Sequence, residues 1–156
     1  PRRFRRPAQC ARPAAVILPD INVLLYAFRR DSERHADYRD WLEEGVNGHT
    51  AYGIASQTLA SLLRISTHRA VYVRPSSLAE AVAFCSAVLQ PTHCVIVQPG
   101  TRHWEIFTGL CARARVTGNL VQDAWFAALA IESGCEWIST DRDYARFPEL
   151  RWREPF

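Results

Sequence analysis

No apolar run in this sequence approaches the roughly 18 residues that a helix needs to cross a lipid bilayer. The longest candidate near the start, residues 14–18, is much shorter and is typical of a buried strand. Arginines precede it, but no long apolar stretch ends in a small-residue cleavage site, so we expect no secretory signal. The sequence alone therefore favours a cytoplasmic protein that makes no use of a membrane.

Patterns that form zinc sites and disulfide frameworks are also missing. The five cysteines are odd in number and no two of them have C-x-x-C spacing. None of the five histidines forms an H-x-x-x-H pair, which argues against a histidine metal site on a helix. We interpret the thiols as reduced and mostly buried, as is usual in the cytosol.

Acidic residues are absent from the first fourteen positions. That segment holds five arginines: Arg2, Arg3, Arg5, Arg6 and Arg12. Since the chain has 19 basic and 16 acidic residues in total, the remainder keeps 14 basic residues against 16 acidic ones. We predict a basic, disordered tail over residues 1–14 and a single domain over residues 15–156. The tail could bind nucleic acid weakly, but its prolines favour an extension without a role.

Segments with strand and helix patterns alternate along the chain. Strands are predicted over residues 14–18, 50–54, 94–97, 136–139 and, at an edge, 150–153. Helices are predicted over residues 21–28, 35–44, 56–67, 81–89 and 120–132. A further helix is predicted to begin after Pro99, and a short helical turn is predicted over residues 143–147. Ser77 and Glu80 have capping-box spacing, and Asn119 is a candidate helix cap. The alternation predicts an α/β fold with a mostly parallel central sheet flanked by helices.

Acidic residues stand where predicted strands end. Asp20 follows the strand over 14–18, and Asp141 follows the strand over 136–139. Asp123 lies in the first turn of a predicted helix, and Asp143 reaches the same place if the turn curls back. Because ligand sites in parallel sheets lie beyond the carboxyl ends of the strands, we expect these acids at one edge of the sheet.

Carboxylates that converge on one spot repel one another unless a cation lies between them. Hard oxygen ligands with open water positions suit Mg²⁺ or Mn²⁺. Such an ion lowers the pKa of a bound water and orients a phosphate, which makes phosphodiester hydrolysis the natural chemistry. Each acid also has an ordinary structural interpretation, as a helix cap, a first-turn residue or a turn former. The hypothesis depends on several acids meeting at one edge.

Three segments together resemble a PIN domain, and more specifically a VapC-type toxin ribonuclease of a type II toxin–antitoxin system. They are residues 18–27 (LPDINVLLYA), 118–124 (GNLVQDA) and 140–147 (TDRDYARF), in order within roughly residues 16–153. The resemblance implies a PIN-like three-layer α/β/α domain and a Mg²⁺- or Mn²⁺-dependent endoribonuclease that cleaves RNA phosphodiester bonds. It also implies a cognate VapB-type antitoxin and, frequently, a homodimer.

The resemblance assigns catalytic and metal-binding roles to Asp20, Asp123 and Asp141, with Asp143 as an additional metal ligand. Many members also carry a Glu in a pattern like L-x-E-L-x-R. The corresponding residues 59–64 read LASLLR, so Ser61 stands in place of that Glu. A hydroxyl can bind a metal-bound water or a phosphate but has no charge, so the site would hold its metal less tightly unless Asp143 compensates.

Several neighbouring residues are candidates for supporting roles. Asn22 orients the Asp20 carboxylate or caps the local helix, and Thr140 orients a phosphate or completes the strand end. The candidate RNA-binding residues are the basic strip near Ser61 and an arginine between two acids: Arg64, His68, Arg69 and Arg142. Contacts of this kind position an RNA backbone and do not specify its sequence.

Two other functions remain open. A phosphatase of the haloacid-dehalogenase type also has an Asp after its first strand, but it needs a second Asp where this chain has Asn22, and no Lys follows a mid-chain strand. A catalytically weak or inactive PIN domain would bind RNA or a protein partner without cutting. Such a module should bind metal weakly and be indifferent to the loss of Asp20.

Overall fold

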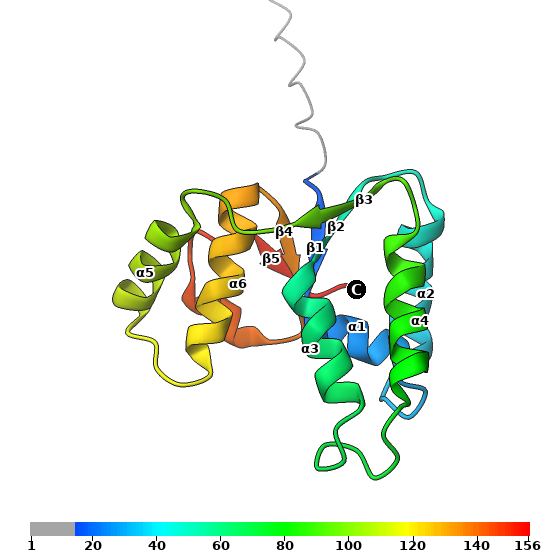
Figure 1. Ribbon diagram of the computed structural model, residues 1–156. Coiled ribbons are helices and arrows are strands. Elements are labelled where there is room, and N and C mark those ends of the chain that lie inside the picture. The colour runs from blue at the N-terminus through cyan, green and yellow to red at the C-terminus, as the bar shows by residue number, and fades with distance from the viewer. Residues whose placement is uncertain (1–14) are drawn as a thin grey trace, which may run out of the picture.

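The computed structural model describes residues 15–156, and the predicted disordered tail over residues 1–14 lies outside the described residues. A five-stranded sheet with the order β3-β2-β1-β4-β5 forms the centre of the described part. Every neighbouring pair of strands is parallel. Helices cover both faces of this sheet (Figure 1), so the predicted three-layer α/β/α fold is confirmed.

The observed elements match the predicted order. The strands are β1 (Ile17–Pro19), β2 (Tyr52–Ala55), β3 (Cys94–Val97), β4 (Glu136–Ile138) and β5 (Trp152–Arg153). The helices are α1 (Ile21–Phe28), α2 (His35–Asn47), α3 (Ser56–Ser66), α4 (Leu78–Leu89), α5 (His103–Ala114), α6 (Leu120–Ser133) and the short 3₁₀ helix η1 (Arg142–Arg146). The ends of β1 differ from the predicted strand, because its ladder with β4 covers only residues 17–19.

Two apolar cores lie on opposite faces of the sheet. Helices α5 and α6 cover one face, and α1 to α4 cover the other (Figure 1). Successive residues of a strand contribute to different cores, as the two-residue period of a strand requires. Trp137 belongs to the core under α6, whereas its neighbour Ile138 belongs to the core under α1 to α4.

The first strand lies at the centre of the sheet, and the chain leaves it in two directions. It first adds β2 and β3 on one side, then returns through α5 and α6 to add β4 and β5 on the other. Such a reversal opens a crevice beyond the carboxyl ends of the strands where it occurs. These strands are β1 and β4, and Pro19 pairs with Ile138 at their ends.

Local sequence accounts for where several helices begin and end. The predicted capping box is confirmed, because Ser77 and Glu80 exchange both of their side-chain to backbone hydrogen bonds at the start of α4. Gly134 ends α6 with a φ of 69°, which glycine adopts without strain. The proposed cap at Asn119 is wrong: its backbone is already helical, and its side chain makes no capping bond.

Two expectations from composition can be compared with the described residues. Cys85, Cys94, Cys111 and Cys135 are free, the first and last of them buried. Within residues 15–156, no helix combines the length and apolar character that a membrane crossing requires.

Candidate active site

Asp20 lies at the carboxyl end of β1 beside the end of β4, where its amide donates a hydrogen bond to the carbonyl of Ile138 at 2.8 Å. It follows β1 directly and its exposed fraction is only 4%. The amide of Ile21 donates a hydrogen bond to Oδ1 at 2.6 Å, and the Ser139 hydroxyl donates to Oδ2 at 2.6 Å. Both carboxylate oxygens are thus fixed, one by the first residue of α1 and one by the residue that follows β4.

The Ser139 hydroxyl connects the groups around Asp20. Besides donating to Asp20, it accepts hydrogen bonds from Nδ2 of Asn22 at 3.2 Å and from the amide of Asp141 at 3.0 Å. Asn22 therefore reaches the Asp20 carboxylate through Ser139. Sequence reasoning selected the next residue, Thr140, whose side chain forms no hydrogen bond with the described residues. The sequence signal for Ser139 was a hydroxyl at a strand end two residues before Asp141, and that signal is not specific until the pairing of β1 with β4 is known.

Asp123 and Asp141 lie close enough to Asp20 to affect its ionisation. Burial raises the pKa of Asp20 to about 6, against hydrogen bonds from Ser139 and Ile21, and the negative charges of Asp123 and Asp141 raise it further. Burial likewise raises the pKa of Asp123 to about 6, with further contributions from Asp141 and Asp143. The structure thus brings the four predicted acids into one electrostatic neighbourhood.

Asp141 and Asp143 differ in their surroundings. Asp141 caps η1, since its Oδ1 accepts a hydrogen bond from the Asp143 amide at 2.8 Å. Asp143 is exposed, and its carboxylate pairs with Arg146 at 3.1 Å. Of the four acids, Asp143 is thus the one whose charge already has a partner among the described residues.

Tyr144 is buried beside these acids. It was not assigned a role from the sequence. Burial, together with the charges of Asp20 and Asp123, raises the pKa of its phenol well above the ordinary value. The phenol therefore stays neutral, and its proximity to Asp123 opposes the rise in the pKa of that carboxyl. Its position in the motif after Asp141 and Asp143 was the available signal.

The donor set suits a divalent cation. Asp20, Asp123 and Asp141 form no ion pair with any side chain in residues 15–156. In addition, the buried Oδ1 of Asn22 has no hydrogen-bond partner there, which leaves an acceptor for a metal-bound water. Carboxylate and amide oxygens are the ligands that Mg²⁺ and Mn²⁺ prefer.

The described side chains do not form a closed metal cage. No three Asp, Glu, His or Cys side chains in this part of the chain lie close enough together to hold an ion by themselves. Mg²⁺ commonly takes one or two carboxylates and completes its octahedron with water and substrate phosphate. The open arrangement fits that mode of binding.

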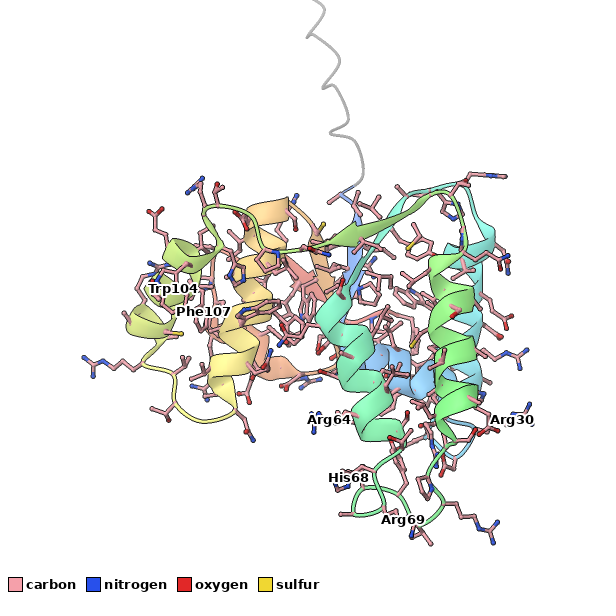
Figure 2. The ribbon with its side chains drawn as sticks, in the orientation of Figure 1. Arg30, Arg64, His68, Arg69, Trp104 and Phe107 are labelled. Atoms are coloured by element: carbon pink, nitrogen blue, oxygen red, sulfur yellow. The ribbon has the colours of Figure 1, made fainter. Side chains whose placement is uncertain are left out.

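The other predicted site residues lie farther along α3 or on the surface. Ser61 is half-buried on α3, and no hydrogen bond within the described chain joins it to the acids. Arg142 pairs with Glu154 at 3.6 Å and remains highly exposed. Arg64, His68 and Arg69 follow one another along the end of α3 and the loop after it (Figure 2).

Replacing Ser139 by Ala should destabilise the protein by about 1–3 kcal/mol, because three polar groups lose a buried partner. The pKa of Asp20 should also rise, since the Ser139 hydrogen bond lowers it. Urea unfolding and NMR titration of the Asp20 carboxyl would measure the two effects. Thr140→Ala is the matched control and should change neither. Equal effects of both substitutions would contradict the conclusion that Ser139 links the groups around Asp20.

Comparison with known proteins identifies the family of this fold and site. The family model described as PIN domain matches residues 17–150, so the chain belongs to the PIN-domain family. More particularly, it is similar to VapC ribonuclease Mb2897 of Mycobacterium bovis, with 40% identity over 136 residues, 87% of this chain and 92% of the relative. Ribonuclease VapC25 of Mycobacterium tuberculosis is 36% identical over 140 residues, 90% of this chain and 99% of that protein.

Solved structures show the same fold at low sequence identity. VapBC2 from Rickettsia felis, bound to a promoter DNA fragment, has a TM-score of 0.65 and 17% identity, covering 89% of this chain and 98% of that one. VapBC-1 from nontypeable Haemophilus influenzae has a TM-score of 0.62 and 14% identity, covering 90% and 98%. The phosphatase alternative has no support, since the family is the PIN domain and the chain contains no lysine.

Proposed function

We propose that this protein is a metal-dependent endoribonuclease that cleaves RNA phosphodiester bonds. One observation carries the proposal: Asp20, Asp123 and Asp141 share an electrostatic neighbourhood between β1 and β4 and have no cationic partner among the described residues. The relatives named ribonucleases, at 36–40% identity over nearly their whole length, support the same reaction.

Asp20, Asp123 and Asp141 would hold Mg²⁺ or Mn²⁺ together with water and substrate phosphate, with Asp143 as an additional ligand once it leaves Arg146. When bound, the ion supplies a water of lowered pKa and neutralises charge on the phosphate. Ser139 holds the Asp20 carboxylate in one orientation, and Tyr144 places a neutral phenol beside Asp123. Asp20 and Asp123, whose raised pKa values favour protonation, would have to release their protons in order to bind a cation.

We also infer that the chain is the toxin of a toxin–antitoxin pair. The similarity to VapC ribonucleases, and to the VapC-containing complexes named VapBC, supports a VapB-type antitoxin as partner. The homodimer stays a prediction from the family resemblance, and the cytoplasmic location stays a prediction from the composition. Light scattering of the purified toxin would determine whether it is a dimer.

A non-catalytic PIN module is the second candidate function, and one observation favours it. Ser61 is neutral at the position where many members have Glu, so the site has one negative charge fewer. A weakly bound metal would leave a domain that binds RNA or a partner without cutting.

The test uses purified protein, freed of any partner and incubated with a panel of structured RNAs. Reactions contain Mg²⁺, Mn²⁺ or a chelator. We expect cleavage with either metal and none with chelator. Cleavage that persists in chelator would mean another mechanism or a contaminating nuclease. RNA binding without cleavage in any metal would instead favour the non-catalytic module.

A further inference from the structure

The end of α3 and the loop after it form a strongly basic segment, which we call the arm (residues 64–74). No acidic residue occurs between Glu44 and Glu80, whereas the arm alone contains Arg64, Arg69 and Arg74. All three arginines are exposed. The arm therefore presents positive charge with no negative charge of its own.

The arm arginines also lack partners elsewhere in residues 15–156. Half of the 14 arginines described form ion pairs with carboxylates: Arg29, Arg34, Arg39, Arg113, Arg142, Arg146 and Arg153. None of the arm arginines is among them. Exposed guanidinium groups without carboxylate partners are available for phosphate oxygens, which they can bind with two parallel hydrogen bonds.

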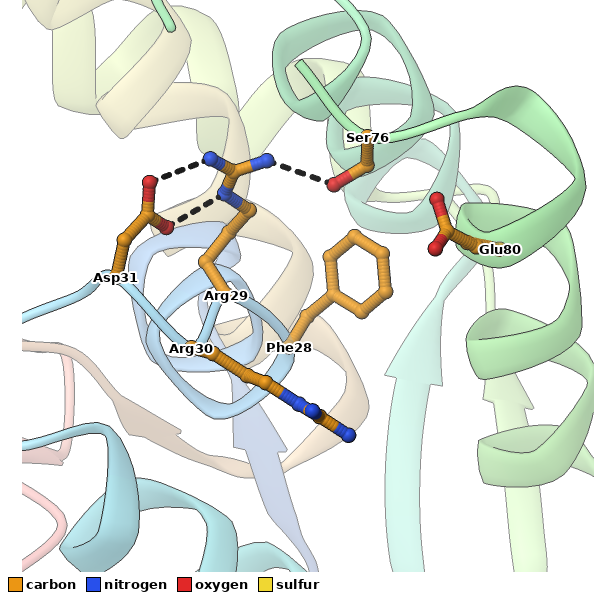
Figure 3. A pocket seen from close by; sticks show the side chains of 6 residues that line it. All are labelled: Phe28, Arg29, Arg30, Asp31, Ser76 and Glu80. Atoms are coloured by element: carbon orange, nitrogen blue, oxygen red, sulfur yellow. Dashed lines mark hydrogen bonds and ion pairs between the residues drawn. The ribbon is translucent and has the colours of Figure 1, made fainter. Parts of the chain in front are cut away.

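Arg29 fastens the arm to the rest of the fold. Its guanidinium is buried and donates to Asp31 at 2.6 and 2.9 Å, to the Ser76 hydroxyl at 2.8 Å and to the carbonyl of Arg74 at 3.0 Å. It also lies 4.0 Å from the centre of the Tyr72 ring. Figure 3 shows Arg29 between Asp31 and Ser76. A loop held in this way loses little further freedom on binding a ligand.

Helix α1 connects Arg29 to the carboxylate site. Asp20 caps the start of α1, and Arg29 caps its end. At 1.5 Å per residue, the two ends are roughly 13 Å apart along the axis. On α3, Arg64 lies about one turn beyond Ser61, and Figure 2 shows its side chain on the side of α3 that faces α6 in that view. The arm thus continues α3, the helix that follows β2, and Arg29 holds it to the end of α1, the helix that follows β1.

We propose that the arm binds the phosphate backbone of the RNA whose cleavage is proposed above, at a place separate from the carboxylates. The proposal rests on the proposed function for the choice of RNA as ligand. Charge dominates the arm, as in nucleic-acid contacts, whereas the core of a protein interface is depleted of charge. Val71 and Val73 are exposed between the arginines and offer apolar contact to bases.

The test measures binding of an RNA hairpin over a series of salt concentrations. All proteins carry Asp20→Asn so that the RNA stays intact. The arm variant combines Arg64→Gln, Arg69→Gln and Arg74→Gln. The matched control, Arg39→Gln with Arg102→Gln and Arg115→Gln, removes the same charge from α2 and the two ends of α5. The arm variant should bind at least tenfold more weakly, and its salt slope should fall by about one for each phosphate that an arginine no longer neutralises.

Other outcomes would overturn the proposal. Equally weakened binding in the arm variant and the control would mean that only net charge matters. If the arm variant binds RNA as before but no longer binds poly-glutamate, which serves as an acidic probe, the arm would be assigned to an acidic protein partner. A separate outcome distinguishes the two proposals. If the protein with Asp20 intact cuts no RNA, and RNA binding is lost in the arm variant but kept in the control, the nuclease proposal fails and the arm proposal stands.

Arg29→Gln tests whether Arg29 holds the arm. Removal of its hydrogen bonds should speed tryptic cleavage after Arg69 several-fold, while circular dichroism shows an intact fold. An unchanged cleavage rate would show that other contacts order the arm and that Arg29 does not hold it in place.

Discussion

Exchanging Asp20 for Asn should lower the rate of metal-dependent RNA cleavage by at least about a hundredfold, since even outer partners of metal ligands commonly contribute ten- to a hundredfold. The substitution keeps the shape of the side chain. Its amide oxygen can still accept a hydrogen bond from Ile21 or from Ser139. The negative charge is removed, and with it the attraction that this buried carboxylate offers a cation.

The other acids provide a ranking that tests the geometry. Asp143 is exposed and paired with Arg146, so Asp143→Asn should reduce the rate less than Asp20→Asn. Asp40→Asn, on the exposed face of α2, is the matched control and should leave the rate unchanged. Cleavage assays at saturating Mn²⁺ would compare the three variants. Full activity of Asp20→Asn would rule out the proposed site.

The meeting of the acids was predictable because it depends on a general property of parallel sheets. Asp20 and Asp141 each follow a strand, and Asp123 begins a helix that runs back along the sheet, so all three had to reach the carboxyl edge. Their roles as ligands remain a prediction. What the sequence could not specify was that β1 and β4 are direct neighbours, because that pairing joins segments more than a hundred residues apart.

The residues that sequence reasoning missed depend on such distant pairings. Ser139 contacts Asp20 across 119 positions in the chain, and one hydroxyl after a strand looks like any other until the register is known. Arg29 reaches Ser76 across 47 positions, and its buried guanidinium would have been interpreted as an exposed helix end. Ser61 shows the opposite case: its position is plain from the family pattern, but no described contact gives it a role.

The metal-free protein should be more stable at pH 5 than at pH 7.5. The pKa of Asp20 in the folded protein is about 6, above the ordinary 3.8, so the folded state binds the proton more tightly than the unfolded state does. The resulting stabilisation is complete below about pH 4 and is lost as the pH rises through about 6. Between pH 5 and pH 7.5 the decrease from Asp20 is about 1 kcal/mol. The contribution of Asp123 to stability also decreases as the pH rises. This decrease is smaller because solvent screens its half-exposed carboxyl.

Addition of Mn²⁺ or Mg²⁺ at pH 7.5 should reverse this decrease, since the ion binds the ionised carboxylates of the folded state. A metal concentration one hundred times its Kd stabilises by about 2.7 kcal/mol, and each kcal/mol raises the Tm of a domain of this size by about 2–4 °C. At pH 5 the rise should be smaller because protons compete for the same oxygens. Thermal unfolding at both pH values, with chelator and with metal, measures the effect. Asp20→Asn should flatten the pH dependence and weaken the response to metal together, because both arise from one carboxylate. A flat pH profile with a full metal response would place the cation elsewhere.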